Sequence, residues 1–352
     1  MDVSYNLHII VNTTKAITIS SVLLKHALSG AQAQGVDLPR LLRKCGIPVD
    51  VFEHTESRLP LENIVKLLRY CNGVMNDEAN GLLQSPMRLG SFRMMALAAV
   101  HSQNLGQALE RCLDFYNLFA NSFHYELKTG RRFAQITMKR RDGHSIIDDY
   151  AICSMLSVIH RFSGWFCNDR LILNQIGFDH PPPPYRKELH YMFYGAPVLF
   201  HQDINSISFD RHYLDYPVVQ TEMQVESYVR RAPMDIFLPL DAGGLWTMDV
   251  RRRLKEAFAS QRQLLSLEIL AEEMSLTPQT LRRRLRKEGS SFDIIKSHIR
   301  RDIAIHHLGD NQLTMEDIAE AAGYTEPSSF IRAFKSWTGF TPLQFRKGLD
   351  RL

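Results

Sequence analysis

A helix–turn–helix pattern that occurs twice in the last third of the 352-residue chain constrains the fold more than any other feature. In the second copy, Thr314 is placed to cap a helix that turns at Gly323, and another helix follows from Glu326 to Trp337. Glycine suits this turn because it adopts a positive φ without the steric cost that other residues meet. Phe330 and Phe334, four residues apart, predict the buried face of the second helix. The pattern therefore predicts two helices and a tight turn between about residues 314 and 337.

The first copy lies at about residues 266–288 and carries the same signals. Thr277 is expected to cap its second helix, and Pro278 stands at the first helical position, where a missing N–H costs nothing. Ser275 occupies the position of Gly323, and we expect a less regular turn because serine takes a left-handed backbone at greater cost. Ala271 aligns with Ala319 at an offset of 48 residues, and Arg283 aligns with Arg332 at an offset of 49. The difference indicates that the second copy has gained one residue in its turn.

A helix of 17 residues, Phe292–Leu308, is predicted between the two copies, with Ile295, Ile299 and Ile303 on its apolar side. At about 1.5 Å per residue this linker helix would be roughly 26 Å long. Neighbouring major grooves recur every 34–36 Å or so along one face of DNA, and a rod of this size can hold two helices in such grooves.

The second helix of the first copy has a basic face outside its apolar stripe. Leu281 and Leu285 predict the stripe, and the remaining faces carry Gln279, Arg282, Arg283, Arg286 and Lys287. From Thr247 onward 18 Lys and Arg stand against 14 Asp and Glu, whereas the preceding residues carry 24 of each, so the net charge of +4 falls entirely in this third. A basic helix alone is as often a solvated face as a binding surface, but the two-copy pattern favours binding.

The second copy continues into a longer block of residues at fixed spacing: Ile318-Ala319, Gly323-Tyr324, Ser328, Phe330, Arg332, Phe334-Lys335, Gly339, Thr341-Pro342 and Phe345-Arg346. This block resembles the signature of the AraC/XylS family of bacterial transcription regulators. Ser266–Phe292 is similar to the first helix–turn–helix of that family, and the resemblance covers about Leu254 to Arg346.

The resemblance implies a sequence-specific regulator that binds double-stranded promoter or operator DNA through the second helix of each copy. By position, the base-facing candidates are Gln279, Arg282, Arg283, Ser328, Ile331 and Arg332, and the full DNA-binding set adds Thr277, Arg286 and Lys335. Thr277 and Ser328, near the helix starts, are expected to contact phosphate groups. Such contacts position the protein on the duplex but do not distinguish one base sequence from another. Pro327 and Ile331 stand where polar readers are common in the family, so we expect less direct readout by the second copy.

The first 232 residues predict an α+β domain, because helical segments come first and an antiparallel sheet follows. Two alternating segments about Thr129-Gly130-Arg131 predict a β-hairpin. Residues 1–16 are interpreted as a tail or short strand. The expected helices are Ser20–Gln34, Leu38–Lys44, Leu61–Cys71, Glu78–Leu83, Met94–His101, Leu105–Phe119 with Asn104 as its cap, Ser145–Phe166, Tyr185–Phe193 and Tyr213–Arg231.

Four short stretches in this region resemble the helix-rich, arabinose-binding-type effector domain of one AraC-like branch, which includes ornithine-utilisation and virulence regulators: Gly35–Gly46, Arg58–Leu61, Asn104–Leu109 and Tyr194–Phe200. This resemblance implies sensing of an unidentified small-molecule effector and self-association as a homodimer. By analogy with the family, activation is favoured over repression, with RNA polymerase as a further partner.

The expected fold class is therefore an α+β N-terminal effector and dimerisation domain, followed by an all-α domain with two helix–turn–helix motifs joined by a linker helix. We expect the first domain at residues 1–232, a linker at 233–246 and the DNA-binding domain at 247–352, with motifs at about 266–288 and 314–337.

The remaining features bear on compartment. The five cysteines include no Cys-x-x-Cys pair and no spacing that suits zinc, which predicts reduced thiols, no metal or cofactor, and a cytoplasmic protein. No run approaches the roughly 18 apolar residues of a membrane span, and no secretory signal is recognisable, so no membrane partner is expected.

Two other classes of function fit the sequence less well. An enzyme is not expected, because the sequence contains no Gly-x-Ser-x-Gly, no phosphate-binding glycine loop and no His-Glu-x-x-His. An enzyme domain fused to a DNA-binding module, such as a DNA-repair methyltransferase, would need a cysteine in a Pro-Cys-His setting, which none of the five has. A ligand-independent architectural DNA-binding protein stays open. It is disfavoured because more than 200 charge-balanced residues would then have no evident task.

Overall fold

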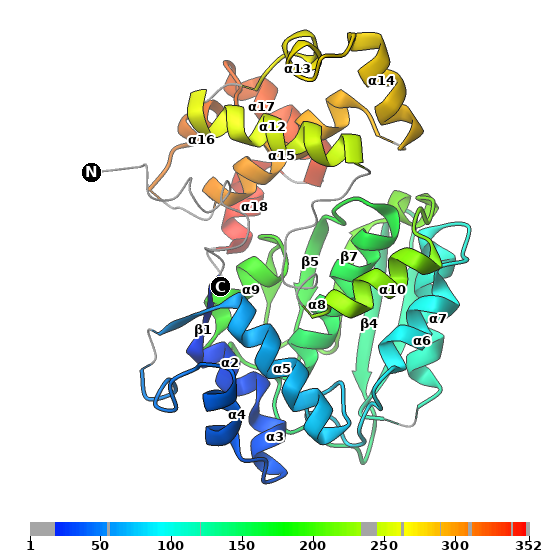
Figure 1. Cartoon of the computed structure of the whole chain (residues 1–352), viewed down its shortest axis with the longest axis vertical. Coiled ribbons are helices and arrows are strands. Elements are labelled where there is room, and N and C mark those ends of the chain that lie inside the picture. The colour runs from blue at the N-terminus through cyan, green and yellow to red at the C-terminus, as the bar shows by residue number, and fades with distance from the viewer. Residues whose placement is uncertain are drawn as a thin grey trace. The chain divides into compact units, whose positions relative to one another are not determined.

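A computed structural model of the chain describes residues 18–54, 57–119, 121–233, 245–261, 264–288, 290–308, 312–338 and 341–349. These residues form two compact units, an N-terminal unit of residues 18–233 and a C-terminal unit of residues 245–349 (Figure 1). Residues 1–16 and residues 234–244 of the expected linker lie outside the described part of the chain.

The N-terminal unit contains a mixed five-stranded sheet made of β3 (Phe123–Thr129), β4 (Phe133–Arg140), β5 (Leu173–Gly177), β6 (Val198–Leu199) and β7 (Asn205–Asp210). The strands run in the order β3-β4-β7-β5-β6, and neighbours are antiparallel except β5 and β6, which are parallel. The predicted hairpin is confirmed as β3 and β4, and the Gly130 N–H donates to the Phe133 carbonyl at its turn (2.8 Å).

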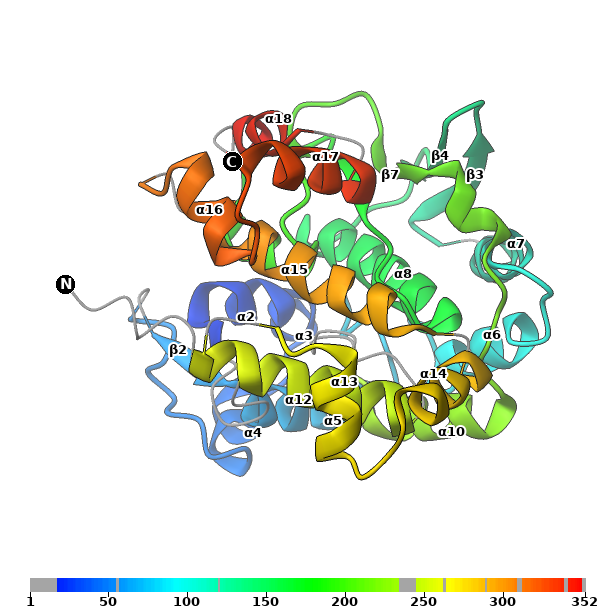
Figure 2. The ribbon, with the colours of Figure 1, turned by 90° about the horizontal axis from the view of Figure 1, so that it is seen from above.

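A long helix, α8 (Tyr150–Cys167), packs against β7 and lies in the middle of this unit (Figure 2). Fourteen of its 18 residues are buried, so it is covered by protein on nearly every side. Helix α7 (Leu105–Asn117) packs against β3 and α6 (Ser91–Ala99), and α10 (Glu222–Arg231) packs against α6. As predicted, Asn104 caps α7, since its side-chain oxygen accepts from the Gln107 N–H at 3.0 Å.

The first part of the N-terminal unit is mainly helical. Its short strands β1 (Thr18–Ser20) and β2 (Arg58–Pro60) pair antiparallel across about 40 residues of chain. The other elements of the unit are α2 (Ser21–Ala27), α3 (Ser29–Ala33), α4 (Leu38–Lys44), α5 (Leu61–Met75), α9 (Arg186–Met192) and the 3₁₀ turn η2 (Arg211–Asp215). The predicted helix Leu38–Lys44 matches α4 at both ends.

Several predicted helices in this unit are wrong in extent or type. The helix predicted at Ser145–Phe166, for example, begins only at Tyr150. Residues 20–34 form two helices that break at Leu28, and residues 213–231 form η2 and α10 with an extended stretch between them. Residues 78–83 are not a helix, because Asn80 and Gly81 take positive φ and the buried Asp77 carboxylate binds backbone N–H groups there.

The C-terminal unit is all helix over its described residues, in agreement with the expected fold class. Its helices are α12 (Leu245–Gln261), α13 (Leu267–Glu273), α14 (Pro278–Lys287), α15 (Phe292–Leu308), α16 (Met315–Ala321), α17 (Pro327–Thr338) and α18 (Pro342–Leu349). The linker helix has the predicted bounds, and Ile295, Ile299 and Ile303 are buried in one core with residues of the other helices.

Two glycines of the N-terminal unit meet backbone to backbone. A Cβ on Gly30, in α3, would overlap the backbone of Asn80 and Gly81, and Gly81 itself has a φ of 74°. By contrast, a Cβ on Gly73, in the exposed last part of α5, would have nothing within 4 Å. Gly30 is therefore required by packing, whereas Gly73 is not.

We expect Gly30→Ala to lower the free energy of unfolding by about 3 kcal/mol, because a helix and a turn must separate to admit one methyl group. Gly73→Ala should instead raise it by about 0.5–1 kcal/mol, since alanine favours a helix interior. Urea unfolding of the two variants beside the wild-type chain measures both changes. Equal effects of the two substitutions would contradict the close approach of α3 to Gly81.

Candidate DNA-binding surface

The two helix–turn–helix turns have the same backbone structure. Ser275 and Gly323 both take left-handed conformations, with φ of 53° and 78°. The same two hydrogen bonds close each turn: Ser275 N–H to Glu272 O (2.9 Å) and Leu276 N–H to Ala271 O (2.8 Å), then Gly323 N–H to Glu320 O (2.8 Å) and Tyr324 N–H to Ala319 O (2.9 Å). The expectation of a less regular first turn is therefore wrong, because the surrounding helices hold Ser275 in this conformation.

The second helices of the two motifs, α14 and α17, start at equivalent prolines, Pro278 and Pro327. Pro327 is therefore the first residue of α17, a position that suits proline because its fixed φ matches a helix and its missing N–H would have no partner there. Counted from these prolines, eight of the nine candidates occupy the second, fifth, sixth and ninth positions: Gln279 and Ser328, Arg282 and Ile331, Arg283 and Arg332, Arg286 and Lys335.

The fourth and eighth positions of both helices are the buried ones. Leu281, Leu285, Phe330 and Phe334 each have no exposed surface. All nine candidates, including Thr277 at the start of α14, are exposed. We call these nine residues the candidate surface.

The basic members of the candidate surface are free to meet a polyanion. No carboxylate of the described residues lies within salt-bridge distance of Arg283, Arg286 or Lys335. Among the residues that the structure describes, Arg332 donates only to the Ser329 hydroxyl, at 3.3 Å. Arg282 has a carboxylate nearby: the pKa of Glu268 is lowered, first by hydrogen bonds from its own N–H and from Ser266, and then by the charge of Arg282.

Thr277 has the capping role that the sequence predicts. Its hydroxyl accepts from the Thr280 N–H at 3.2 Å and lies 2.9 Å from the Thr280 hydroxyl. Thr314 caps α16 in the same way and shares a capping box with Asp317.

Two arginines near the candidate surface face the protein instead of solvent. The guanidinium carbon of Arg284, in α14, lies 3.8 Å from the centroid of the Trp246 ring. Arg300, in α15, donates to the Gly323 carbonyl (3.0 Å) and lies 4.6 Å from the centroid of the Tyr324 ring. Arg300 therefore binds the linker helix to the turn of the second motif.

The linker helix and α12 together carry the two motifs. Helix α15 packs against α12, α16, α17 and α18, whereas α14 packs against α13 and α12. The second motif is thus packed directly on the linker helix, and the first is joined to it largely through α12.

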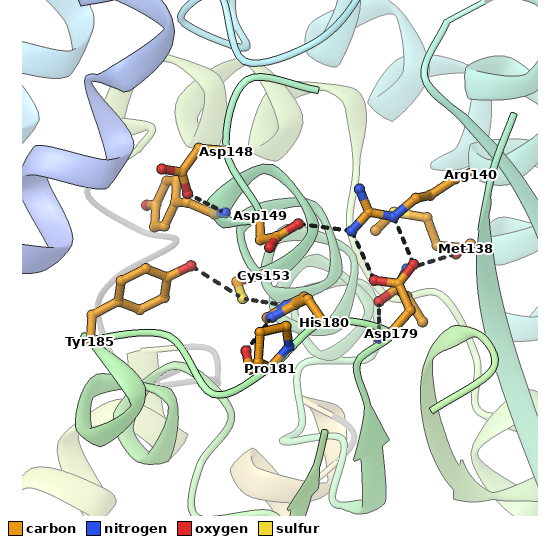
Figure 3. Close-up of polar contacts among 11 residues, drawn as sticks. Met138, Arg140, Asp148, Asp149, Cys153, Asp179, His180, Pro181 and Tyr185 are labelled. Atoms are coloured by element: carbon orange, nitrogen blue, oxygen red, sulfur yellow. Dashed lines mark hydrogen bonds and ion pairs between the residues drawn. The ribbon is translucent and has the colours of Figure 1, made fainter. Parts of the chain in front are cut away.

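The N-terminal unit contains a polar network where α8 meets the sheet (Figure 3). Arg140, at the end of β4, binds both oxygens of Asp179 (2.7 and 2.9 Å) and one oxygen of Asp149 (2.8 Å). Burial alone would raise the pKa of Asp179, but hydrogen bonds from Arg140 and Asn205 outweigh it and lower that pKa. The network joins β4, the segment after β5 and the start of α8.

Cys153, in α8, lies beside His180 and Tyr185, but its thiol lacks the exposure and the lowered pKa of a catalytic nucleophile (Figure 3). Its sulfur is 3.9 Å from His180 Nε2 and 3.7 Å from the Tyr185 hydroxyl, and it is completely buried. Burial raises the pKa of the thiol to about 12, so it stays protonated near neutral pH. The arrangement is a packed core contact.

His160, also in α8, is buried and neutral. Its Nε2–H donates to the Leu171 carbonyl at 2.7 Å, while its Nδ1 has no hydrogen-bond partner among the described residues. Burial lowers its pKa to about 3. Within the described residues, no group of three or more His, Cys, Asp and Glu is arranged to hold a metal ion, and no helix is long and apolar enough to span a membrane.

Comparison with known proteins identifies the family. Residues 35–218 match the model of the arabinose-binding domain of AraC transcription regulators, N-terminal part, and residues 270–348 match a helix-turn-helix domain. The chain belongs to the AraC family of transcription regulators. It is thus a DNA-binding regulator with an arabinose-binding-type N-terminal domain, as the resemblance predicted.

Relatives of this AraC-family chain include the ornithine utilization regulator of Pseudomonas aeruginosa, 24% identical over 315 residues, which cover 89% of this chain and 91% of that protein. The transcriptional regulator VqsM of the same organism is 28% identical over 188 residues, which cover 50% of this chain and 56% of that protein. The crystal structure of the regulator CdpR, also from Pseudomonas aeruginosa, matches 88% of this chain and 96% of its own at 18% identity, with a TM-score of 0.33. Each of these proteins is named as a regulator.

Sequence analysis of this AraC-family regulator did not single out the residues that hold its motifs in place. Arg284 and Arg300 are arginines among many, and their contacts with Trp246, Tyr324 and the Gly323 carbonyl distinguish them from solvated arginines. Glu288, whose carboxylate accepts hydrogen bonds from Trp246 and Thr247, carried one signal, because an acidic residue directly after a basic helix is unfavourable for that helix.

The neutral state of His160 predicts a pH dependence of stability. Its pKa is about 3 in the folded chain against 6.5 for a free histidine, so below pH 6.5 only the unfolded chain gains this proton and stability falls. His160→Gln retains a donor for the Leu171 carbonyl and cannot titrate. Between pH 7 and pH 5 the wild type should lose about 2 kcal/mol more stability than the variant.

Urea unfolding of both chains at the two pH values measures this difference, and other titrating groups cancel in the comparison. Equal losses in the two chains would show that His160 is not buried in a neutral state.

Proposed function

We propose that this regulator reads a specific operator with α14 and α17, and that residues 1–232 sense a small effector and hold two copies of the chain together. In this proposal residues 233–246 are the linker and residues 247–352 the DNA-binding domain. The observation that carries the DNA half is the matched candidate surface, which occupies the same four positions of both helices opposite two buried positions. Two equivalent helices joined by a 17-residue helix suit successive grooves on one face of DNA.

Within this surface we assign different roles to the arginines and the hydroxyl residues. Arg283 and Arg332 are both the sixth residue of their helix, and a guanidinium there can bind guanine O6 and N7 with two hydrogen bonds. Gln279, Arg282 and Ile331 are further base-facing residues, with Ile331 offering an apolar contact. Arg286 and Lys335 lie a turn further on, where they suit phosphate. Thr277 and Ser328 lie at the helix starts, where hydroxyl and N–H groups favour phosphate.

The effector is supported by the family of the N-terminal domain. The family model is named for arabinose binding, and one relative is named for ornithine utilization, so both compounds belong among the first to be tested.

Dimerisation and activation complete the proposal. A dimer would double the number of DNA contacts and raise affinity through effective concentration. We expect activation more than repression, with RNA polymerase as the partner of the DNA-bound dimer. Sedimentation equilibrium of the full chain tests the dimer, which a monomer at every concentration would contradict.

The assigned roles predict different outcomes for three alanine variants in selection from randomised duplexes. Arg283→Ala should lose preference at one or two base pairs, a loss worth about 1–3 kcal/mol at each. Arg332→Ala should lose it about one helical turn away. Thr277→Ala should weaken binding to all sequences alike and lower stability by about 1 kcal/mol, because it removes a helix cap.

Lys287→Ala serves as a matched control, since Lys287 is an exposed cation of the same helix outside the candidate surface. It should keep the wild-type preference. If both arginine variants also keep that preference and lose only overall affinity, Arg283 and Arg332 are phosphate anchors and not readers.

The effector half predicts a ligand-dependent gain in stability. A compound present at about 100 times its dissociation constant should stabilise the chain by about 2.7 kcal/mol. Thermal unfolding with a metabolite panel that includes ornithine and arabinose measures this gain. A panel without any stabilising compound would favour the ligand-independent architectural protein instead.

A further inference from the structure

Glu288 closes the first helix–turn–helix motif with an unusual set of contacts. It is the residue directly after α14, and its carboxylate accepts three hydrogen bonds from the first turn of α12. The donors are the Trp246 N–H (3.0 Å), the Thr247 N–H (2.8 Å) and the Thr247 hydroxyl (2.7 Å). Thr247 is only 2% exposed, so two of the three bonds lie at a buried residue.

The position of Glu288 is explained by α12 and not by its own helix. The first N–H groups of a helix lack partners within it, and the partial positive charge at that end favours a carboxylate. The end of α14 has the opposite polarity, so an acidic residue there is unfavourable for α14 itself. The carboxylate therefore stabilises the joint between the two helices at the expense of α14.

A second contact reinforces the same joint. Arg284 lies one turn before Glu288, and its guanidinium stacks over the ring of Trp246, the residue whose N–H binds Glu288. A planar guanidinium on an indole face is the strongest common cation–π pair in proteins. The end of α14 thus contacts the first turn of α12 through both a carboxylate and an arginine.

This joint lies on the route between the two reading helices. Helix α17 packs directly on the linker helix α15, whereas α14 packs on α12, and α12 packs on α15. The direction of α14 relative to α17 therefore depends on how firmly α14 is fixed to α12.

We propose that Glu288 is a positioning residue for DNA recognition, which with Arg284, Trp246 and Thr247 fixes the direction of the first reading helix. The proposal rests on the proposed role of α14 in reading DNA. Glu288 itself touches no DNA in this proposal; it acts by holding Arg283 and its neighbours in register with α17.

The test measures binding of the full chain to two labelled duplexes by fluorescence anisotropy. One duplex is obtained with the wild-type chain by selection from random DNA, and the other has the same composition in scrambled order. Glu288→Ala should bind the selected duplex about tenfold more weakly, as if one base contact were lost. It should bind the scrambled duplex as tightly as the wild type or more tightly, because a negative charge has been removed.

Two further substitutions separate positioning from charge and from folding. Glu272→Ala removes a carboxylate of the same motif that is exposed on α13, and it should leave the preference between the duplexes unchanged. Glu288→Gln keeps the shape and one acceptor, and it should recover part of the preference.

The outcomes distinguish this inference from the proposed function. A wild-type chain without preference between the duplexes would overturn sequence-specific reading itself. If the wild type has a preference, then an unchanged preference in Glu288→Ala overturns the positioning role. An equal loss on both duplexes also overturns it, since that result indicates damage to the fold.

Discussion

Burial of two residues on each of α14 and α17 limits which side chains these two helices can offer to DNA. Leu281 and Leu285 in α14, and Phe330 and Phe334 in α17, have no exposed surface. Rotating either helix to present another face would expose two large apolar side chains, at a cost of about 3–6 kcal/mol. A good contact with one base contributes only about 1–3 kcal/mol, so a DNA contact is too weak to rotate either helix out of the core. The core therefore leaves the second, fifth, sixth and ninth positions exposed, and these are the positions that we propose to read DNA.

The core does not by itself fix the two helices relative to each other. Apolar contacts are non-directional, and small shifts of one helix along another change them little. Polar contacts with defined geometry complete the arrangement at two places. Arg300 binds the linker helix to the turn of the second motif, and Glu288 binds the end of α14 to α12. These contacts require specific partners, and their loss is expected to change specificity more than stability.

Local sequence signals were sufficient where an element depends on its own residues. Thr277 as a cap, Pro278 at the first helical position and the four-residue apolar spacing located α14. The spacing of Phe330 and Phe334 located α17, and the linker helix has the predicted bounds. The prediction failed at residues 78–83, because the carboxylate of Asp77 and the approach of Gly30 from another helix shape that segment. Glu288 and Arg300 were missed for the same reason, since their partners lie 41 and 23 residues away. No signal in the sequence located a ligand site.

The account rests on two helices that read DNA on one face, at a spacing fixed by the linker helix. Hydroxyl-radical footprinting of the full chain on a duplex selected from random DNA tests this claim most directly. For each protomer the account predicts two protected windows on one face, with centres about 10 base pairs apart. Protection of one window alone, or uniform protection around the duplex, would contradict it.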